Sequence, residues 1–282
     1  MTTPGPAAPH PGTALGPAGP PRGTTPGPAA VLRSEWTKFR TVRATVGTLA
    51  GAFLAVVCYG LLFGTANGRE YLGAPLDEQA SFDPRQTAFR ALMLVQLLVS
   101  AVGVLTVTSE YSSGTMRTSV TAVPRRGRLL AGKAALVALV MLPCGPLLAL
   151  ASFLTSQATL AAQGAPGLAL TDPGVPGAIA GAGLYMTLVG LYGVAMGFLL
   201  RRTAGAVTLG TFLLILPAMA SLFPEWLARA VLTYWPTSAG ARLFGAGPSA
   251  DGLPPQAGFA VLAVTVLALL LAALALFRSR DV

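Results

Sequence analysis

Six long apolar segments dominate the pattern of this 282-residue chain. Each reaches or approaches the ~20 residues that a helix needs to cross the hydrocarbon core of a bilayer. Polar, charged or Gly/Pro-rich stretches separate them. We therefore expect an all-α, polytopic membrane protein with six transmembrane helices, at residues 44–64, 88–109, 134–160, 177–200, 203–223 and 257–277.

The segment before the first span, residues 31–46, predicts an amphipathic helix. Its apolar positions recur every three or four residues, at Leu32, Trp36, Phe39, Val42 and Val46. We expect this helix to lie in the membrane interface, with Trp36 at the headgroup level beside Phe39, and with Lys38 and Arg40 facing anionic lipid. The alternative is that the segment extends the first span into water.

A strongly basic stretch, residues 110–133, separates the second and third spans. It holds one acid, Glu110, and five cations, Arg117, Arg125, Arg126, Arg128 and Lys133. A segment this charged is excluded from hydrocarbon, so both neighbouring spans must end at one membrane face.

The same stretch carries a short amphipathic pattern. Gly114 lets the backbone turn out of the second span, and Glu110 is expected where that span meets water. Three apolar residues at helical spacing predict an exposed ridge that Pro124 closes: Met116, Val120 and Val123. Arg117, Arg125 and Arg126 would lie beside the ridge, where they can bind acidic or carbonyl groups of a partner protein. The alternative is that these cations only fix topology and bind lipid.

The remaining segments complete the predicted organisation. Residues 1–30 contain nine prolines and six glycines without an apolar period, which is typical of a disordered arm. Residues 31–282 form one membrane domain. Residues 65–87 are predicted to be an exposed loop, and residues 224–256 to form short interfacial or re-entrant helices before the last span.

Charge sets the orientation. The composition, with 53% hydrophobic and 10% charged residues and a mean hydropathy of +0.65, is that of a membrane protein. The net charge of +9 comes from short clusters between apolar runs, which is not the continuous basic face of a nucleic-acid-binding protein.

The side that holds both termini and residues 110–133 carries 14 of the 19 Lys and Arg residues. By the positive-inside rule we expect both termini in the cytoplasm and the chain in the cell membrane.

The sequence offers no catalytic or metal-binding set. The string GRLLAGKA at 127–134 is one residue short of a phosphate-binding loop, because Ala134 replaces the hydroxyl that would hold magnesium. The single histidine, His10, lies in the arm and has no clustered partner for catalysis or metal binding. The interiors of the spans hold almost no ionisable residue, whereas ion-coupled carriers keep such residues at membrane depth. We therefore expect no enzyme activity in this chain, and energy supplied by a partner.

Four strings resemble the membrane subunit of a type-2 ATP-binding-cassette (ABC) exporter: RSEWTKFRTVRAT before the first span, TSEYSSGTMRTSVTAVPRRGRLLAGK between the second and third, YWPTSAGARLFG before the last, and the RSRD tail. The resemblance covers residues 31–282. It implies that residues 31–46 are a connecting helix. It also implies that a coupling helix docks on a separate ATPase through Glu110, Tyr111, Gly114, Met116, Arg117, Val120, Val123, Pro124, Arg125 and Arg126.

The family assembly further implies two membrane subunits, as a homodimer or a pair, and two ATPases that bind ATP and magnesium. No cofactor is then expected in this chain, and lipid is its other partner. The alternative class is a non-transporting six-span interaction protein, such as a sensor or an immunity factor.

Overall fold

The computed structural model describes residues 27–122, 126–245 and 253–279, and every element in these ranges is helical. The elements are α1 (Pro28–Thr41), α2 (Arg43–Gly73), α3 (Leu76–Gln79), α4 (Pro84–Arg90), α5 (Leu92–Ser112), α6 (Thr115–Ala122), α7 (Arg126–Gln163), α8 (Val175–Leu200), α9 (Thr203–Ile215), the 3₁₀ helix η1 (Leu216–Leu222), α10 (Glu225–Tyr234), α11 (Pro236–Ala241), the 3₁₀ helix η2 (Arg242–Phe244) and α12 (Pro255–Ser279). The predicted arm falls mostly on residues 1–26, outside the described residues. Its last residues, from Pro28, belong to α1.

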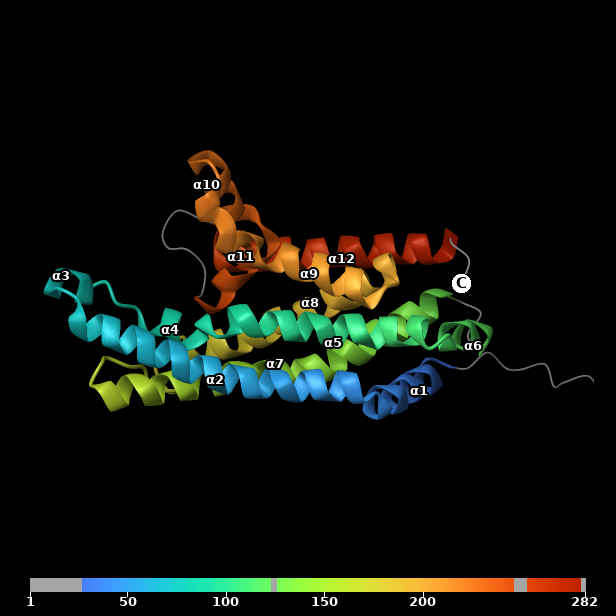
Figure 1. Cartoon of the computed structure of the whole chain (residues 1–282), viewed down its shortest axis with the longest axis horizontal. Coiled ribbons are helices and arrows are strands. Elements are labelled where there is room, and N and C mark those ends of the chain that lie inside the picture. The colour runs from blue at the N-terminus through green and yellow to red at the C-terminus, as the bar shows by residue number, and fades with distance from the viewer. Residues whose placement is uncertain (1–26, 123–125, 246–252, 280–282) are drawn as a thin grey trace, which may run out of the picture.

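Within the residues that the structure describes, six helical segments are long and apolar enough to cross a membrane, which confirms the predicted multi-pass, all-α fold. They are Arg43–Gly73, Pro84–Ser112, Arg126–Gln163, Val175–Leu200, Thr203–Leu222 and Pro255–Ser279. They form an elongated bundle (Figure 1). One end of the bundle, which we name the α6 end, carries α1, α6 and the C-terminal end of α12. The opposite end, the α3 end, carries α3.

The first span is longer than predicted, and the expected loop at 65–87 is wrong. Helix α2 continues to Gly73, and α3 and α4 follow. The helix ends where Pro75 forces the preceding residue, Ala74, into an extended conformation with ψ of 150°. Before that point the backbone of α2 packs closely on α7, since a Cβ placed on Gly64 would lie 1.8 Å from the Thr159 hydroxyl oxygen.

Helix α8 is the centre of the bundle. It packs against α5, α7 and α12. Of its apolar 18-residue stretch, 72% of the residues are buried, whereas the corresponding stretches of α2 and α12 are 17% buried. Small residues of α8 make this packing possible. A Cβ on Gly193 would lie 2.0 Å from the Ser100 carbonyl oxygen, and one on Gly103 would lie 2.1 Å from the Gly190 carbonyl oxygen. Backbone therefore touches backbone between α5 and α8.

The connection from α1 to α2 differs from the predicted continuous helix at 31–46. Helix α1 ends at Thr41, Val42 is extended, and α2 starts at Arg43. The buried residues of α1 are Val31, Glu35 and Phe39, at spacings of four, whereas Trp36 is 42% exposed. The buried stripe is thus rotated relative to the predicted one and includes an acid.

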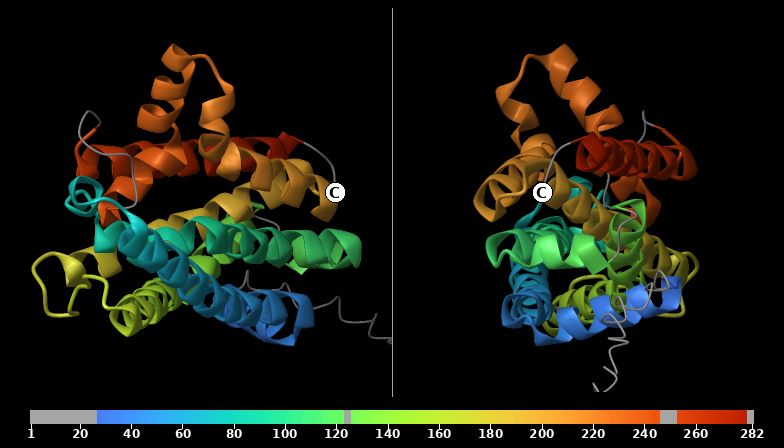
Figure 2. Two further views of the ribbon diagram at one scale, coloured as in Figure 1. Left: turned by 60° about the vertical axis from the view of Figure 1, so that its left-hand side comes forward. Right: turned by 90° about the vertical axis from the view of Figure 1, so that its right-hand side faces the viewer.

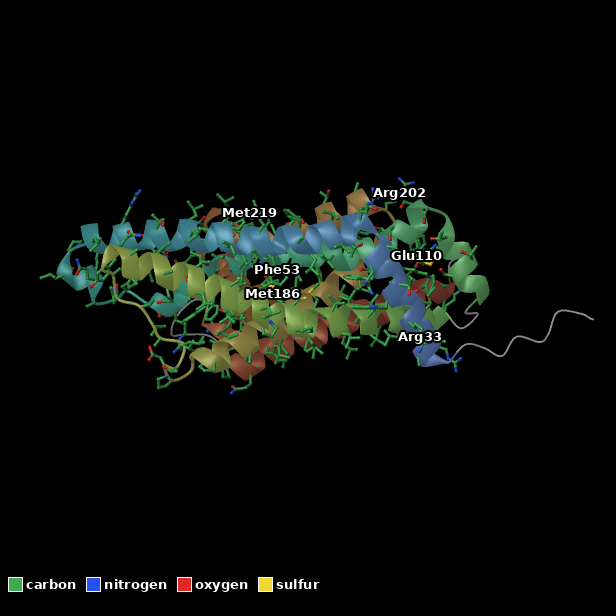
Figure 3. The ribbon with its side chains drawn as sticks, turned by 90° about the horizontal axis from the view of Figure 1, so that it is seen from below. Arg33, Phe53, Glu110, Met186, Arg202 and Met219 are labelled. Atoms are coloured by element: carbon green, nitrogen blue, oxygen red, sulfur yellow. The ribbon has the colours of Figure 1, made fainter. Side chains whose placement is uncertain are left out.

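The basic stretch at 110–133 is a helical connection. Helix α5 continues to Ser112, Gly114 turns the chain with a φ of +73°, α6 follows, and α7 is helical from Arg126. Arg33, Glu110 and Arg202 all lie toward the α6 end (Figure 3). The cations near the Arg201–Arg202 turn and α1 therefore gather at the same end as α6.

The segment between α9 and α12 forms short helices, as predicted. Helix α10 stands away from the bundle in both views of Figure 2. The rest of the segment packs on α8 and α12. Its contacts include a hydrogen bond from the Trp235 indole N–H to the Leu213 carbonyl at 2.9 Å and edge-on packing of Phe244 against Phe89 and Tyr185.

Replacing Gly193 by Ala tests the central packing. The new methyl group must push α5 away from α8, because the atom it meets is backbone, and we expect a loss of ~1–3 kcal/mol in the free energy of unfolding. Gly177→Ala is the matched control in the same helix, since nothing lies within 4 Å of its Cβ position. Gly177→Ala should be neutral or stabilise by up to ~1 kcal/mol through helix propensity. Unfolding in a sodium dodecyl sulfate titration measures both, and equal effects would refute the close contact.

Candidate functional site

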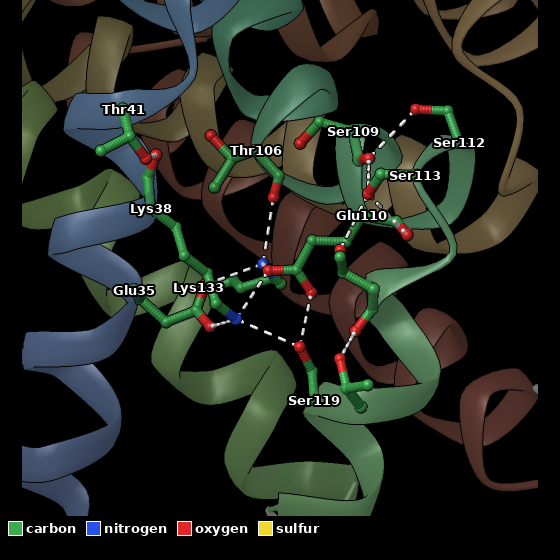
Figure 4. A network of polar contacts seen from close by, with 12 residues as sticks. Glu35, Lys38, Thr41, Thr106, Ser109, Glu110, Ser112, Ser113, Ser119 and Lys133 are labelled. Atoms are coloured by element: carbon green, nitrogen blue, oxygen red, sulfur yellow. Dashed lines mark hydrogen bonds and ion pairs between the residues drawn. The ribbon is translucent and has the colours of Figure 1, made fainter.

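Four charged side chains meet at the α6 end and form the main candidate site. Glu35 and Lys38 come from α1, Glu110 from the last turns of α5, and Lys133 from the start of α7 (Figure 4). We call this set the charge ring, because each side chain contacts the two of opposite charge. The two acids and two cations balance to zero.

The contacts of the charge ring are all short. Lys133 Nζ lies 2.7 Å from Glu35 Oε2 and 2.8 Å from Glu110 Oε1. Lys38 Nζ lies 3.0 Å from Glu35 Oε1 and 2.8 Å from Glu110 Oε1. These are the distances of charge-assisted hydrogen bonds.

Every proton of the two ammonium groups has an acceptor. Lys133 donates its third hydrogen bond to the Thr106 carbonyl at 3.1 Å, and Lys38 donates its third to the Ser119 hydroxyl at 3.1 Å. Ser119, on α6, donates in turn to Glu110 Oε2 at 3.2 Å. An ammonium has three donors, so both cations are fully satisfied. The ring and its two neutral partners therefore connect α1, α5, α6 and α7.

Burial makes these contacts strong. The side chain of Lys133 is 1% exposed and that of Glu35 is 2% exposed, while that of Lys38 is 39% exposed. Burial opposes the charge on Lys38, but the hydrogen bonds from its ammonium to Glu110 and Glu35 outweigh this effect and raise its pKa above the ordinary value. Lys38 thus stays charged throughout the neutral range.

A cavity of about 420 Å³ lies beside the charge ring. Its walls come from the break between α1 and α2 and from the turn between α5 and α6, and include Phe39, Val42, Ser113 and Thr115. All four side chains of the charge ring contribute to the wall of this cavity.

The structure changes the roles of several predicted coupling residues. Glu110 is buried in the charge ring and does not lie at the water boundary. Met116 is 1% exposed and packs into the core, so the predicted exposed ridge is wrong at this residue. Tyr111 is half-buried, with the Arg201 guanidinium 5.6 Å from its ring. The predicted turn at Gly114 is confirmed by its positive φ.

Arg126 also differs from its predicted role. Its guanidinium donates to the Phe277 carbonyl at 2.8 Å and lies 5.8 Å from the Phe277 ring, so it binds the end of α12 in its own chain. Arg117 and Val120 lie on α6, whose backbone alone is described at these two positions. Val123, Pro124 and Arg125 lie outside the described residues.

The predicted interfacial residues divide between two sides of α1. Trp36 and Arg40 are exposed, as an interfacial helix requires, and Trp36 stacks on Phe39. Phe39 is buried, and Lys38 faces Glu35 and Glu110 instead of lipid. Lys38 was therefore assigned to the wrong face.

Sequence reasoning missed Glu35, Lys133 and Ser119 as members of the site. One signal was present: Glu35 and Glu110 are two of only three acids on the side of the membrane predicted to hold 14 cations. A few acids among many cations are expected to form ion pairs with some of them. Nothing in the local sequence says which cations these are, because Lys133 lies 98 residues from Glu35.

Neither a scan against protein-family models nor a search among curated proteins finds a match for this sequence.

Replacing Lys133 by Met tests the charge ring. The variant leaves two buried carboxylates with only Lys38 as a cation, and we expect the free energy of unfolding to fall by ~3–5 kcal/mol. Arg128→Met is the matched control: Arg128 is a half-buried cation on the same helix and makes no ion pair with any described residue. Its effect should be within ~0.5 kcal/mol.

The double variant Lys133→Met/Glu35→Gln should recover part of the loss, because it restores charge balance. A sodium dodecyl sulfate titration followed by circular dichroism measures all three variants. If Lys133→Met and Arg128→Met unfold alike, the ring contributes nothing to the stability of the α6 end.

Proposed function

We propose that this chain is the membrane-spanning subunit of a type-2 ABC exporter, moved by a separate ATPase that docks at the α6 end. The observation that carries the proposal is the charge ring. It binds a short helix outside the spans, α6, and a helix before the first span, α1, to two membrane spans, α5 and α7.

The docking surface is the outer side of α6. Thr115 and Thr118 are exposed there, while Met116 and Ser119 point inward and hold α6 against the bundle. The sequence around α6 is basic, with Arg117 within it and Arg125 just after it. An ATPase surface that presents acidic or carbonyl groups complements this charge.

Movement passes from α6 to the spans through the charge ring. A displacement of α6 that left Glu110 and Lys38 behind would break both Ser119 bonds and leave one N–H of Lys38 and the Oε2 atom of Glu110 without this partner in a poorly solvated site. Separation is therefore costlier than joint movement. ATP binding closes the two ATPases, α6 moves with them, and α1, α5 and α7 follow, which shifts the subunit between inward-open and outward-open states.

The energy source fits this arrangement. The middle stretches of the six spans contain no Asp, Glu, Lys or Arg, so they lack the groups that bind and release a driving proton or ion. The working unit consists of two such subunits, either identical or different, and two ATPases that hold ATP and magnesium. The chain lies in the cell membrane. Its α6 end faces the cytoplasm, in accordance with the excess of cations at this end.

Thr118→Glu tests the docking surface. The new carboxylate would lie against the acidic or carbonyl groups that we propose on the ATPase, and repulsion between them should weaken docking. Tagged full-length protein is isolated from its native membrane in mild detergent, and we expect the ATP hydrolysis that co-purifies with it to fall about tenfold. Thr171→Glu is the matched control, since Thr171 is an exposed threonine in the loop before α8 at the opposite end. If no ATP hydrolysis co-purifies with the unmodified protein, the non-transporting interaction protein is the better assignment.

Ser119→Ala tests transmission separately from docking. This variant removes the hydroxyl that links α6 to Lys38 and Glu110 but leaves the outer side of α6 unchanged. We expect normal recruitment of the ATPase and a smaller ATP-induced movement of the spans. Spin labels at Leu54→Cys, on the exposed face of α2, report that movement after Cys58 and Cys144 are replaced by Ser. An unchanged ATP response would show that the movement takes another route.

A further inference from the structure

The last span, α12, has no residue in the charge ring, although its C-terminal end lies at the α6 end of the bundle (Figure 1). The members of the ring and their two neutral partners come from α1, α5, α6 and α7. A different contact joins α12 to this end of the molecule. Its central residue is Arg126, the first residue of α7.

Arg126 holds the end of α12 in two ways. Its Nη1 atom donates to the Phe277 carbonyl at 2.8 Å and to the Arg278 carbonyl at 3.4 Å, and its guanidinium carbon lies 5.8 Å from the centre of the Phe277 ring. Helix α12 ends at Ser279, so both carbonyls belong to its last turn. Carbonyls of a last turn lack partners within the helix and form the negative end of its dipole, and a guanidinium can bond to them and stack on a ring at the same time.

The contact is supported on both sides. Phe277 is fully buried, and its ring centre lies 5.1 Å from that of Phe198 on α8. A Cβ placed on Gly127 would lie 3.2 Å from a guanidinium nitrogen of Arg278 and 3.6 Å from the Leu274 Cδ1 atom. The start of α7 therefore lies directly against the last two turns of α12.

Elsewhere α12 is attached along one narrow stripe. Its other buried residues are Gly258, Leu262, Val266 and Ala273, and with Phe277 they follow one another at spacings of four and seven. Such spacings place all five on one face of the helix. A helix held along one stripe can tilt about it, so the contact with Arg126 largely decides where the C-terminal end of α12 lies.

Arg126 also lies where a displacement of α6 arrives. Helix α6 ends at Ala122 and α7 begins at Arg126, and a chain spans at most about 3.6 Å per residue, so the connection between the two helices is short. Lys133 of the charge ring lies two turns further along α7, about 10 Å from Arg126 along the helix axis. The same end of α7 thus meets α6, the ring and α12.

We propose that Arg126 is a positioning residue that makes the C-terminal end of α12 follow the displacements of α6. Its role in transport rests on the proposed function: an ATPase moves α6, the charge ring carries the movement to α1, α5 and α7, and Arg126 carries it to the last span. The contact between Arg126 and α12 exists without an ATPase, so the link between α6 and α12 is measurable in the chain alone.

The first experiment uses full-length protein in lipid nanodiscs, without an ATPase. Cys58 and Cys144 are replaced by Ser, and spin labels are placed at Leu54→Cys on α2 and Ala275→Cys on α12, where both side chains are exposed. Helices α2 and α12 lie on opposite sides of the bundle (Figure 1). Double electron–electron resonance then gives the distribution of distances between the two labels, which reports the position of the end of α12.

Met116→Ala loosens α6 in this experiment, because it removes a buried side chain that packs α6 on the core. We expect it to broaden the distribution about twofold when Arg126 is present and to add nothing in an Arg126→Met background, which is the non-additivity of two coupled sites. A merely structural role of Arg126 would give additive effects. Arg126→Lys keeps a cation at the end of α12 and should retain part of the response. Arg128→Met, the matched control on the same helix, should retain all of it.

Two results of this experiment would overturn the proposal. Met116→Ala would broaden the distribution equally with and without Arg126, or it would leave the distribution unchanged when Arg126 is present. In either case the end of α12 does not follow α6 through Arg126.

The second experiment adds ATP to the same labelled protein isolated with its ATPase. We expect ATP to shift the distance between the labels, and Arg126→Met to lose at least about half of this shift, because α12 then no longer follows α7. A full shift in Arg126→Met would show that the movement reaches α12 by another route. If no ATP hydrolysis co-purifies, or ATP shifts nothing in the protein that retains Arg126, the proposed function fails, and the first experiment still decides the role of Arg126.

Discussion

The pairing of buried charges at the α6 end is the constraint on which the rest of the molecule depends. Glu35, Glu110 and Lys133 are almost fully removed from solvent, and in such surroundings an unpaired charge is too costly to keep. Helix α1, which also buries Val31 and Phe39, therefore has one place relative to α5 and α7. Helix α6 shares this restraint through Ser119 and Met116. A protein that pulls on α6 would pull on both spans.

Close helix packing at glycines extends through the bundle. Helices α5, α7 and α8 touch through glycines, and backbone contact of this kind leaves little freedom for sliding. Helices α11 and α12 approach each other in the same way, because a Cβ placed on Gly258 would lie 2.2 Å from the Ala239 carbonyl oxygen. Helix α10, by contrast, stands away from the bundle (Figure 2).

Much of the fold could be predicted, because it follows from local composition. Hydrophobic length alone identifies the six spans. Helix ends were less predictable. Residues 65–73 look like a loop by polarity, yet α2 continues through them because Gly64 and Gly68 pack on α7 and no proline intervenes before Pro75. The candidate site was found only in part: Glu110 and Lys38 were singled out, but each was assigned to the wrong surroundings.

The sequence by itself determined the class of protein, the number of spans and the clustering of cations between them, since each depends on runs of neighbouring residues and on the cost of placing polar groups in hydrocarbon. Only the tertiary structure decided that Glu35, Lys38, Glu110 and Lys133 close into one ring and that Met116 is buried. These facts depend on contacts between residues far apart in the chain. Such contacts are fixed by how the helices rotate and pack, which no local pattern specifies.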